Sequence, residues 1–190
     1  MASTDRIRRQ QIRQLVREAE GYLDLISVLA EAWPLRADVR DRVAQRALDT
    51  LGRLPQTVTD RATPLLIRGR AYQAMERYAD AVPLLEEAAT LDKDNLTTHL
   101  ALGWCYKRLG RIDLAIEALQ NARVAEPEEA IVYYNLACYW SLAKNKEQVL
   151  ENLSRALAID ANFRDLIDGE RDFDNLRDDP DFQALAAVIV

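Results

Sequence analysis

The sequence predicts an all-α protein built mainly from consecutive pairs of helices, and three observations predict this class. Only 6 of the 190 residues are glycine and 6 are proline, while alanine, leucine and charged residues that favour helices are abundant. Apolar residues recur at helical spacing, and no stretch alternates cleanly at the period of two that marks a strand. The chain also repeats its own pattern every 34 residues, a period at which repeat architectures are expected.

Residues 1–61 are predicted to form two helices of unequal length. We expect a long first helix over about 4–32, a turn at the sequence WPLRAD, and a second helix over about 37–53. Pro55 to Pro64 then connects this pair to the repeats. Tyr22 and Ala47 match two columns of the repeats described next, but about 16 extra residues lie between them. The pair is therefore interpreted as a degenerate repeat with an insertion.

Three segments, 62–95, 96–129 and 130–163, align without gaps, and small and large residues recur in them in the same order. The columns hold Gly69, Tyr72, Ala81, Leu85 and Ala88, then Gly103, Tyr106, Ala115, Leu119 and Ala122, then Ala137, Trp140, Val149, Leu153 and Ala156. Each segment reads as two helices. In the second segment Gly110 ends the first helix and Pro127 follows the second. We expect the small column residues to let the two backbones approach closely, Gly69 opposite Ala81 and Gly103 opposite Ala115.

The pattern resembles the tetratricopeptide repeat family, whose motif W-x2-L-G-x2-Y…A-x3-F…P is matched in the second segment. The matching residues are His99, Leu102, Gly103, Tyr106, Ala115, Leu119 and Pro127. The resemblance covers 62–163 and weakens where Lys93 and Ala161 replace proline and Val149 replaces alanine. It implies an α-α superhelix, a tetratricopeptide solenoid with three full hairpins, preceded by the degenerate pair, in one continuous domain.

Residues 164–190 are expected to form an acidic linker and a helix that caps the last repeat. Asp179 or Asp181 beside Pro180 would start this helix, and it would end in the apolar sequence ALAAVIV. Repeat arrays need such caps because the terminal repeat otherwise exposes its apolar face.

The resemblance also implies which side chains line a concave groove, since the first helix of each repeat faces it in this family. The expected partner-binding residues are Leu66, Ile67, Arg70, Gln73, Leu100, Trp104, Lys107, Arg108, Ile131, Tyr134, Asn135 and Cys138. They include three cations and no acid, so a peptide with acidic groups is a suitable partner, and Trp, Tyr and Arg are enriched at binding hot spots. One alternative stays open: the chain's own N- or C-terminal segment fills the groove, because residues 164–182 are acidic.

No catalytic, cofactor-binding or metal-binding constellation is evident in the sequence. His99 occupies the tryptophan column and is read as a packing residue, and one histidine with the separated Cys105 and Cys138 does not supply the usual zinc ligands. Phosphate-binding and nucleophile-elbow motifs are absent from the sequence. We therefore expect a non-catalytic adaptor, without a cofactor, that binds a partner protein or peptide. The alternative is a self-association module that uses the N-terminal insertion or the apolar C-terminal helix.

The charge distribution bears on the class of partner. The net charge of −6 argues against nucleic acid, although residues 5–17 carry five arginines, and residues 160–182 carry nine acids against three arginines. Either these ends are solvated faces, or they attract each other within one chain or between chains. The most apolar run, near 131–143, is too short to cross a bilayer. Two separated cysteines and no signal-peptide pattern predict a cytoplasmic location.

Overall fold

The computed structural model describes residues 2–32, 35–55 and 58–187. Over these residues every regular element is a helix, and no strand occurs. The all-α prediction is therefore confirmed for the described part of the chain. The chain divides into two compact units, unit 1 (Met1–Lys93) and unit 2 (Asp94–Val190). Both helices of the first repeat lie in unit 1, and the helices of the other two repeats lie in unit 2. The sequence had predicted one continuous domain, and the repeat boundaries themselves stay a prediction.

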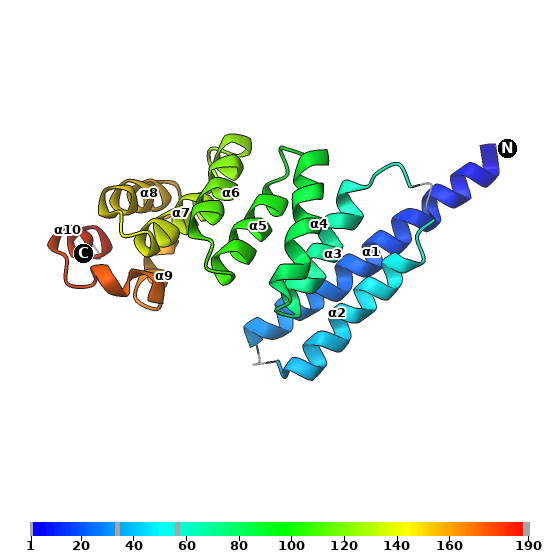
Figure 1. Ribbon diagram of the computed structural model, residues 1–190, viewed down its shortest axis with the longest axis horizontal. Helices are drawn as coiled ribbons and strands as arrows, with labels where there is room; N and C mark the ends of the chain where they lie inside the picture. Colours follow the sequence, from blue (N-terminus) through cyan, green and yellow to red (C-terminus); the bar gives the residue numbers. More distant parts are fainter. Residues whose placement is uncertain (1, 33–34, 56–57, 188–190) are drawn as a thin grey trace. The chain divides into compact units, whose positions relative to one another are not determined.

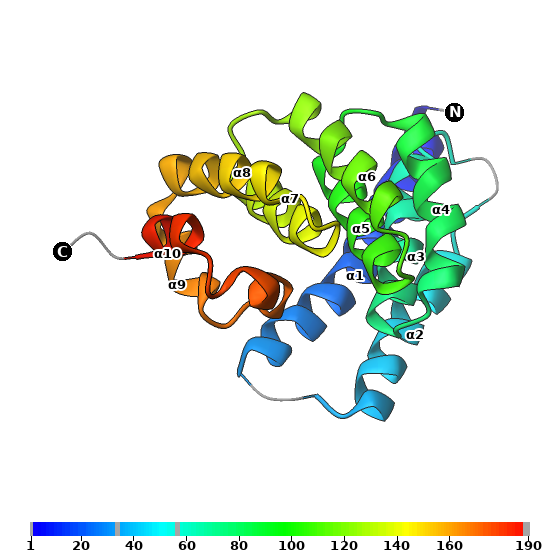
Figure 2. The ribbon, with the colours of Figure 1, turned by 60° about the vertical axis from the view of Figure 1, so that its left-hand side comes forward.

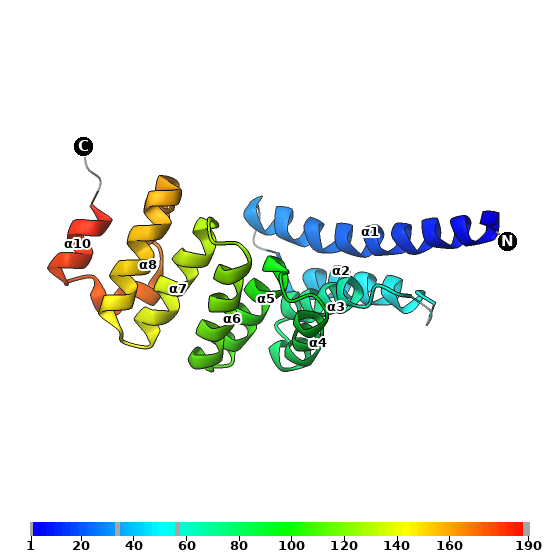
Figure 3. The same ribbon diagram turned by 90° about the horizontal axis from the view of Figure 1, so that it is seen from above.

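Unit 1 contains α1 (Ala2–Ala32), α2 (Ala37–Gly52), α3 (Ala62–Ala74) and α4 (Tyr78–Leu91). Figure 1 shows α1 and α2 side by side, and Figure 3 shows that α1 extends past the ends of the shorter α2. The α1 and α2 bounds agree with the predicted helices to within two residues, while part of the predicted turn, Trp33 and Pro34, lies outside the described residues. The unit's core joins Ala19, Leu23 and Ile26 of α1, Ala44, Ala47 and Leu51 of α2, and Ile67 and Ala71 of α3.

Unit 2 contains α5 (Leu96–Arg108), α6 (Ile112–Ala125), α7 (Ala130–Leu142) and α8 (Lys146–Ile159). These two hairpins are followed by η1 (Ala161–Phe163), α9 (Arg164–Ile167), η2 (Arg171–Leu176) and α10 (Pro180–Ala186). Residues 160–187 are called the C-terminal segment below, and Figure 2 shows this segment folded beside α7 and α8.

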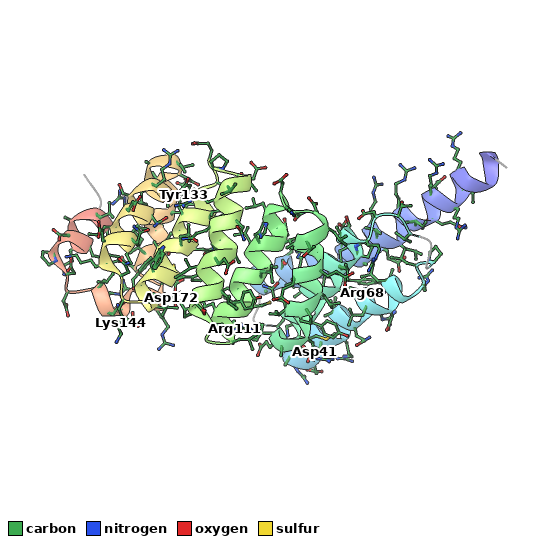
Figure 4. All side chains as sticks on the ribbon, turned by 45° about the horizontal axis from the view of Figure 1, so that its top comes forward. Asp41, Arg68, Arg111, Tyr133, Lys144 and Asp172 are labelled. Carbon is green, nitrogen blue, oxygen red and sulfur yellow. The ribbon has the colours of Figure 1, made fainter. Side chains whose placement is uncertain are left out.

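All three hairpins close with the same hydrogen bonds, because the same backbone turn follows the first helix of each repeat. The N–H groups of Arg77, Arg111 and Asn145 donate to the carbonyls of Tyr72, Tyr106 and Trp140 at 2.9, 2.9 and 3.0 Å. Such a bond, from the third residue after the helix to the last turn of the helix, is typical of a Schellman motif. The residue before each donor, Glu76, Gly110 or Lys144, has a φ of 59°, 73° or 59°, so only the second repeat has the glycine that this left-handed position favours. Arg111 and Lys144 mark two of these turns in Figure 4.

The glycine columns are sites of close helix packing, but leucines are the main neighbours. A Cβ on Gly103 would lie 3.2 Å from Leu119 Cγ and 3.4 Å from the Ala115 carbonyl oxygen. A Cβ on Gly69 would lie 2.5 Å from Leu85 Cγ and Cδ2, and its three nearest atoms all belong to Leu85 rather than to the expected Ala81. The glycine therefore makes room for the branched leucine side chain of the second helix as well as for its backbone.

The predicted acidic linker is largely helical. Asp160 accepts a hydrogen bond from the Asn162 N–H, and Glu170 accepts one from the Asp172 N–H, so side-chain caps begin η1 and η2. Asp179 caps α10 by accepting from the N–H groups of Asp181 and Phe182, which confirms the predicted start of the last helix. Val188, Ile189 and Val190, the expected apolar end of this helix, lie outside the described residues.

Candidate partner-binding surface

In unit 1 the N-terminal helix packs over part of the predicted groove. Ile67 of α3 is buried in the core that α1 and α2 share with α3. Leu66, Arg70 and Gln73 are half-buried. The predicted groove positions of the first repeat therefore contribute to the unit's own core at Ile67 and offer only partly exposed side chains elsewhere.

In unit 2 the C-terminal segment covers the predicted groove residues of α7. Tyr134 and Cys138 are only 4% and 2% exposed. The Tyr134 ring lies 5.1 Å from the Phe163 ring and 5.9 Å from the Phe173 ring, between ring centroids. Phe173 in turn lies 5.2 Å from Phe182. These aromatic pairs bury apolar area and favour the tilted and edge-on geometries seen here, so the segment is packed into the unit rather than laid on its surface.

Polar contacts hold the same segment. Asp172, labelled in Figure 4, forms a largely buried ion pair with Lys107 of α5. Burial raises the pKa of Asp172, and the hydrogen bond from Lys107 opposes that rise. Ser141 Oγ donates to Asn175 Oδ1 at 2.6 Å, and Asn175 Nδ2 donates back to the Ser141 carbonyl at 3.2 Å. In unit 2 the acidic C-terminal segment therefore covers predicted groove residues of α7 and pairs with Lys107 of α5, as the alternative had expected.

Helix α5 keeps an exposed aromatic side chain. Trp104 is 40% exposed, and Lys107 Nζ and Arg108 Cζ lie 5.5 and 6.0 Å from the centroid of its ring. Leu100, Trp104 and Arg108 follow at four-residue spacing, so they share one face of the helix, called the α5 face below. On α7, Ile131 and Asn135 are half-buried. Cations beside an exposed tryptophan combine apolar area with positive charge.

Both cysteines, Cys105 and Cys138, are free and buried. Burial raises the pKa of Cys105 to about 12, and burial also raises the pKa of Cys138. The reactive form of cysteine is the thiolate, so burial disfavours the reactive form of both thiols. His99, the single histidine, is buried in α5, in agreement with its reading as a packing residue.

One surface feature of unit 1 was not anticipated from the sequence. A pocket of about 630 Å³ lies where Arg8, Arg9 and Arg13 of α1 meet residues 58–60. The sequence shows these arginines, but it does not show that residues 58–60, which connect α2 to α3, pass beside them. Over the described residues, no helix combines the length and apolar character needed to cross a membrane.

Comparisons with known proteins agree with this fold. Residues 72–137 match the family model described as Tetratricopeptide repeat. The structure designated MamA AMB-1 C2221 is similar, with 23% identity, a TM-score of 0.56, and coverage of 81% of this chain and 99% of that chain. YrrB, described as a TPR protein with an unusual peptide-binding site, has 21% identity, a TM-score of 0.57, and coverage of 77% and 80%. MamA RS-1 ArsTM double mutant has 18% identity, a TM-score of 0.65, and coverage of 89% and 90%.

No curated protein is similar enough in sequence to be a match. The family match over residues 72–137 and the solved structures together confirm the predicted repeat pattern and its helical-hairpin fold. At these identities the solved structures establish the fold alone.

Proposed function

We propose, from the premise that the chain belongs to the tetratricopeptide repeat family, that it is a non-catalytic scaffold that binds an acidic peptide segment of a partner protein on the α5 face. The observation that carries this proposal is the exposed Trp104 ring with Lys107 and Arg108 close to it. The other predicted groove residues are buried or half-buried, except Arg108 itself.

The chemistry of the α5 face supports a peptide with acidic and apolar side chains. Tryptophan and arginine are the residue types that most often dominate binding energy, and the guanidinium of Arg108 suits a carboxylate. The chain's own Asp172 already pairs with neighbouring Lys107, so this region of α5 accommodates a carboxylate. YrrB, a neighbour in fold, is described as having a peptide-binding site, which is consistent with a scaffold built on the same hairpins.

A random peptide library displayed on phage tests the proposal. Peptides selected on the full chain should be enriched in Asp, Glu and apolar residues, and their affinities should be measured by fluorescence polarisation. Trp104→Ala and Arg108→Glu should each weaken binding by about tenfold or more. Val124→Ala, at an exposed apolar residue of α6, is the matched control and should bind like wild type. Selected peptides that bind Trp104→Ala and Arg108→Glu as tightly as wild type would refute the proposal.

The second candidate function is self-association, and exposed apolar residues of α1 favour it. Leu25, Val28 and Leu29 are exposed, Val28 by 62%, and their spacing places them together along the helix. Light scattering after size exclusion distinguishes the candidates. An oligomer that Leu25→Gln and Leu29→Gln together convert to a monomer would support self-association, and a wild-type monomer at high concentration would oppose it.

Two sequence-based predictions, a cytoplasmic location and the lack of a cofactor, are part of this proposal. A cytoplasmic location fits the free thiols of Cys105 and Cys138, since structural disulfides are typical of oxidising compartments. No cofactor is required by a scaffold whose action is binding alone.

A further inference from the structure

Three potential ligands of a metal ion converge where the C-terminal segment meets α7. Cys138 Sγ and one carboxylate oxygen each of Glu170 and Asp172 all lie within 4.8 Å of one another. Cys138 is buried and the two acids are half-buried. The cluster therefore combines Cys138 of α7 with Asp172 of η2 and with Glu170, the residue before η2. All three side chains are at least half-buried.

A second, independent feature points to the same place. The Tyr134 hydroxyl is buried and forms no hydrogen bond with any residue that the structure describes, although buried polar groups are nearly always paired. Tyr134 lies one helical turn before Cys138 on α7, on the same face of the helix, and its ring lies 5.9 Å from the ring of Phe173, the residue after Asp172. A hydroxyl at this position can donate a hydrogen bond to a water molecule that completes the coordination of a bound ion.

We propose that Cys138, Glu170 and Asp172 bind a divalent, thiol-seeking cation of the zinc class. Thiolate and carboxylate ligands both suit Zn²⁺, and three protein ligands leave its fourth position to water. Bond lengths of about 2.0–2.3 Å require the ligand atoms to move together by roughly 1 Å, which half-buried side chains of a short helical turn permit.

The charges around the cluster are consistent with a dication. A thiolate and two carboxylates supply three negative charges, and neighbouring Lys107 supplies one positive charge. A bound divalent ion therefore makes the site neutral, which limits the cost of burying it. Asp172 has two oxygens, so one can retain Lys107 while the other binds the ion. On binding, the thiol proton leaves to solvent as the sulfur–metal bond forms.

Such an ion would join α7 to the C-terminal segment and stabilise the closed end of unit 2. This inference is separate from the proposed partner binding, because none of its three ligands belongs to the α5 face. The two sites share only Lys107, which pairs with Asp172 and lies beside Trp104. It also departs from the sequence-based expectation, since Cys138 and Glu170 are far apart in the chain and match no known metal-binding spacing.

Titration of the metal-free full chain with Zn²⁺ by calorimetry tests the site, and Co²⁺ absorption reports whether sulfur is a ligand. Wild type should bind one ion with a thiolate charge-transfer band. Cys138→Ser should lose the band, and Glu170→Gln should bind at least about tenfold more weakly. Cys105→Ala removes the other buried cysteine and should bind normally.

Circular dichroism confirms that each variant is folded, and Glu170→Gln changes a half-buried side chain, so it keeps the test informative if Cys138→Ser unfolds. Absence of Zn²⁺ binding to wild type would overturn the inference. Binding that survives both Cys138→Ser and Glu170→Gln unchanged would overturn it as well, because the ion would then lie elsewhere.

Discussion

Substitution of Gly69 by alanine gives the sharpest prediction about how the hairpins pack. In the interior of a helix, alanine is favoured over glycine by about 0.5–1 kcal/mol because it loses less backbone entropy on folding. At Gly69 the added Cβ would lie 2.5 Å from both Leu85 Cγ and Leu85 Cδ2, and Leu85 is fully buried. The two effects therefore oppose each other within one substitution.

The steric effect should win at Gly69. Overpacking of a filled core costs about 1–3 kcal/mol, so after the gain in helix propensity we expect Gly69→Ala to lower the free energy of unfolding by up to about 2 kcal/mol. Gly103→Ala places its Cβ 3.2 Å from Leu119, a smaller overlap, so gain and cost should nearly cancel. A Cβ on Gly21 would have no atom of the described residues within 4 Å outside the neighbouring backbone of its own helix, so Gly21→Ala should stabilise by about 0.5–1 kcal/mol.

Urea unfolding followed by far-ultraviolet circular dichroism measures these differences. Gly21 and Gly69 both belong to unit 1, so they report on the same compact unit and form a matched pair. The Leu85→Ala background isolates the cause. Leu85→Ala alone should cost about 2–5 kcal/mol, but Gly69→Ala should become stabilising once the leucine is absent. The reasoning is refuted if Gly69→Ala stabilises wild type as much as Gly21→Ala, or if the two substitutions are additive.

Three further predictions concern the hairpin turns and the C-terminal segment. Gly110→Ala should destabilise and Lys144→Gly should stabilise by about 1 kcal/mol each, because both positions are left-handed; urea unfolding giving the same sign for both would contradict this. Phe173→Ala removes a fully buried ring, so it should cost about 3–5 kcal/mol and make the C-terminal segment sensitive to limited proteolysis, whereas unchanged resistance would oppose the packing described. Asp179 has a pKa lowered from 3.8, mainly by its hydrogen bond from Lys146, whose own pKa is raised from 10.5 by that bond. Their pairing should therefore stabilise the fold between these two values and be lost as pH falls through the lowered pKa of Asp179 or rises through the raised pKa of Lys146; a melting-temperature difference between wild type and Lys146→Gln that stays constant through the acid range would exclude it.

The helices could be predicted from the sequence because their signals are local. Gly110 and Pro127 mark helix ends within one repeat, and the apolar spacing fixes which side of each helix is buried. The short turns of the acidic linker escaped prediction because three to six residues are too few to show a period. Their caps, Asp160 and Glu170, were visible only as two acids among many.

The candidate site could be predicted only in part, because covering segments come from distant parts of the chain. The family pattern correctly identified the first helices of the repeats, but it could not reveal that Phe163 and Phe173 pack on Tyr134. The excess acid near the C-terminus did indicate a contact with a cation such as Lys107. Ile67 is buried because α1 packs against α3, and no local sequence signal predicts that contact.

Photocrosslinking from one selected acidic peptide to the wild-type chain tests the central claim, that the α5 face binds the partner. The peptide carries a benzophenone amino acid, and mass spectrometry of the irradiated complex locates the crosslinked residues. Crosslinks concentrated on α5 around Trp104, few around Val124 of α6 and competition by unlabelled peptide are expected. Crosslinks that are as frequent around Val124 as around Trp104, or more frequent there, would contradict the account.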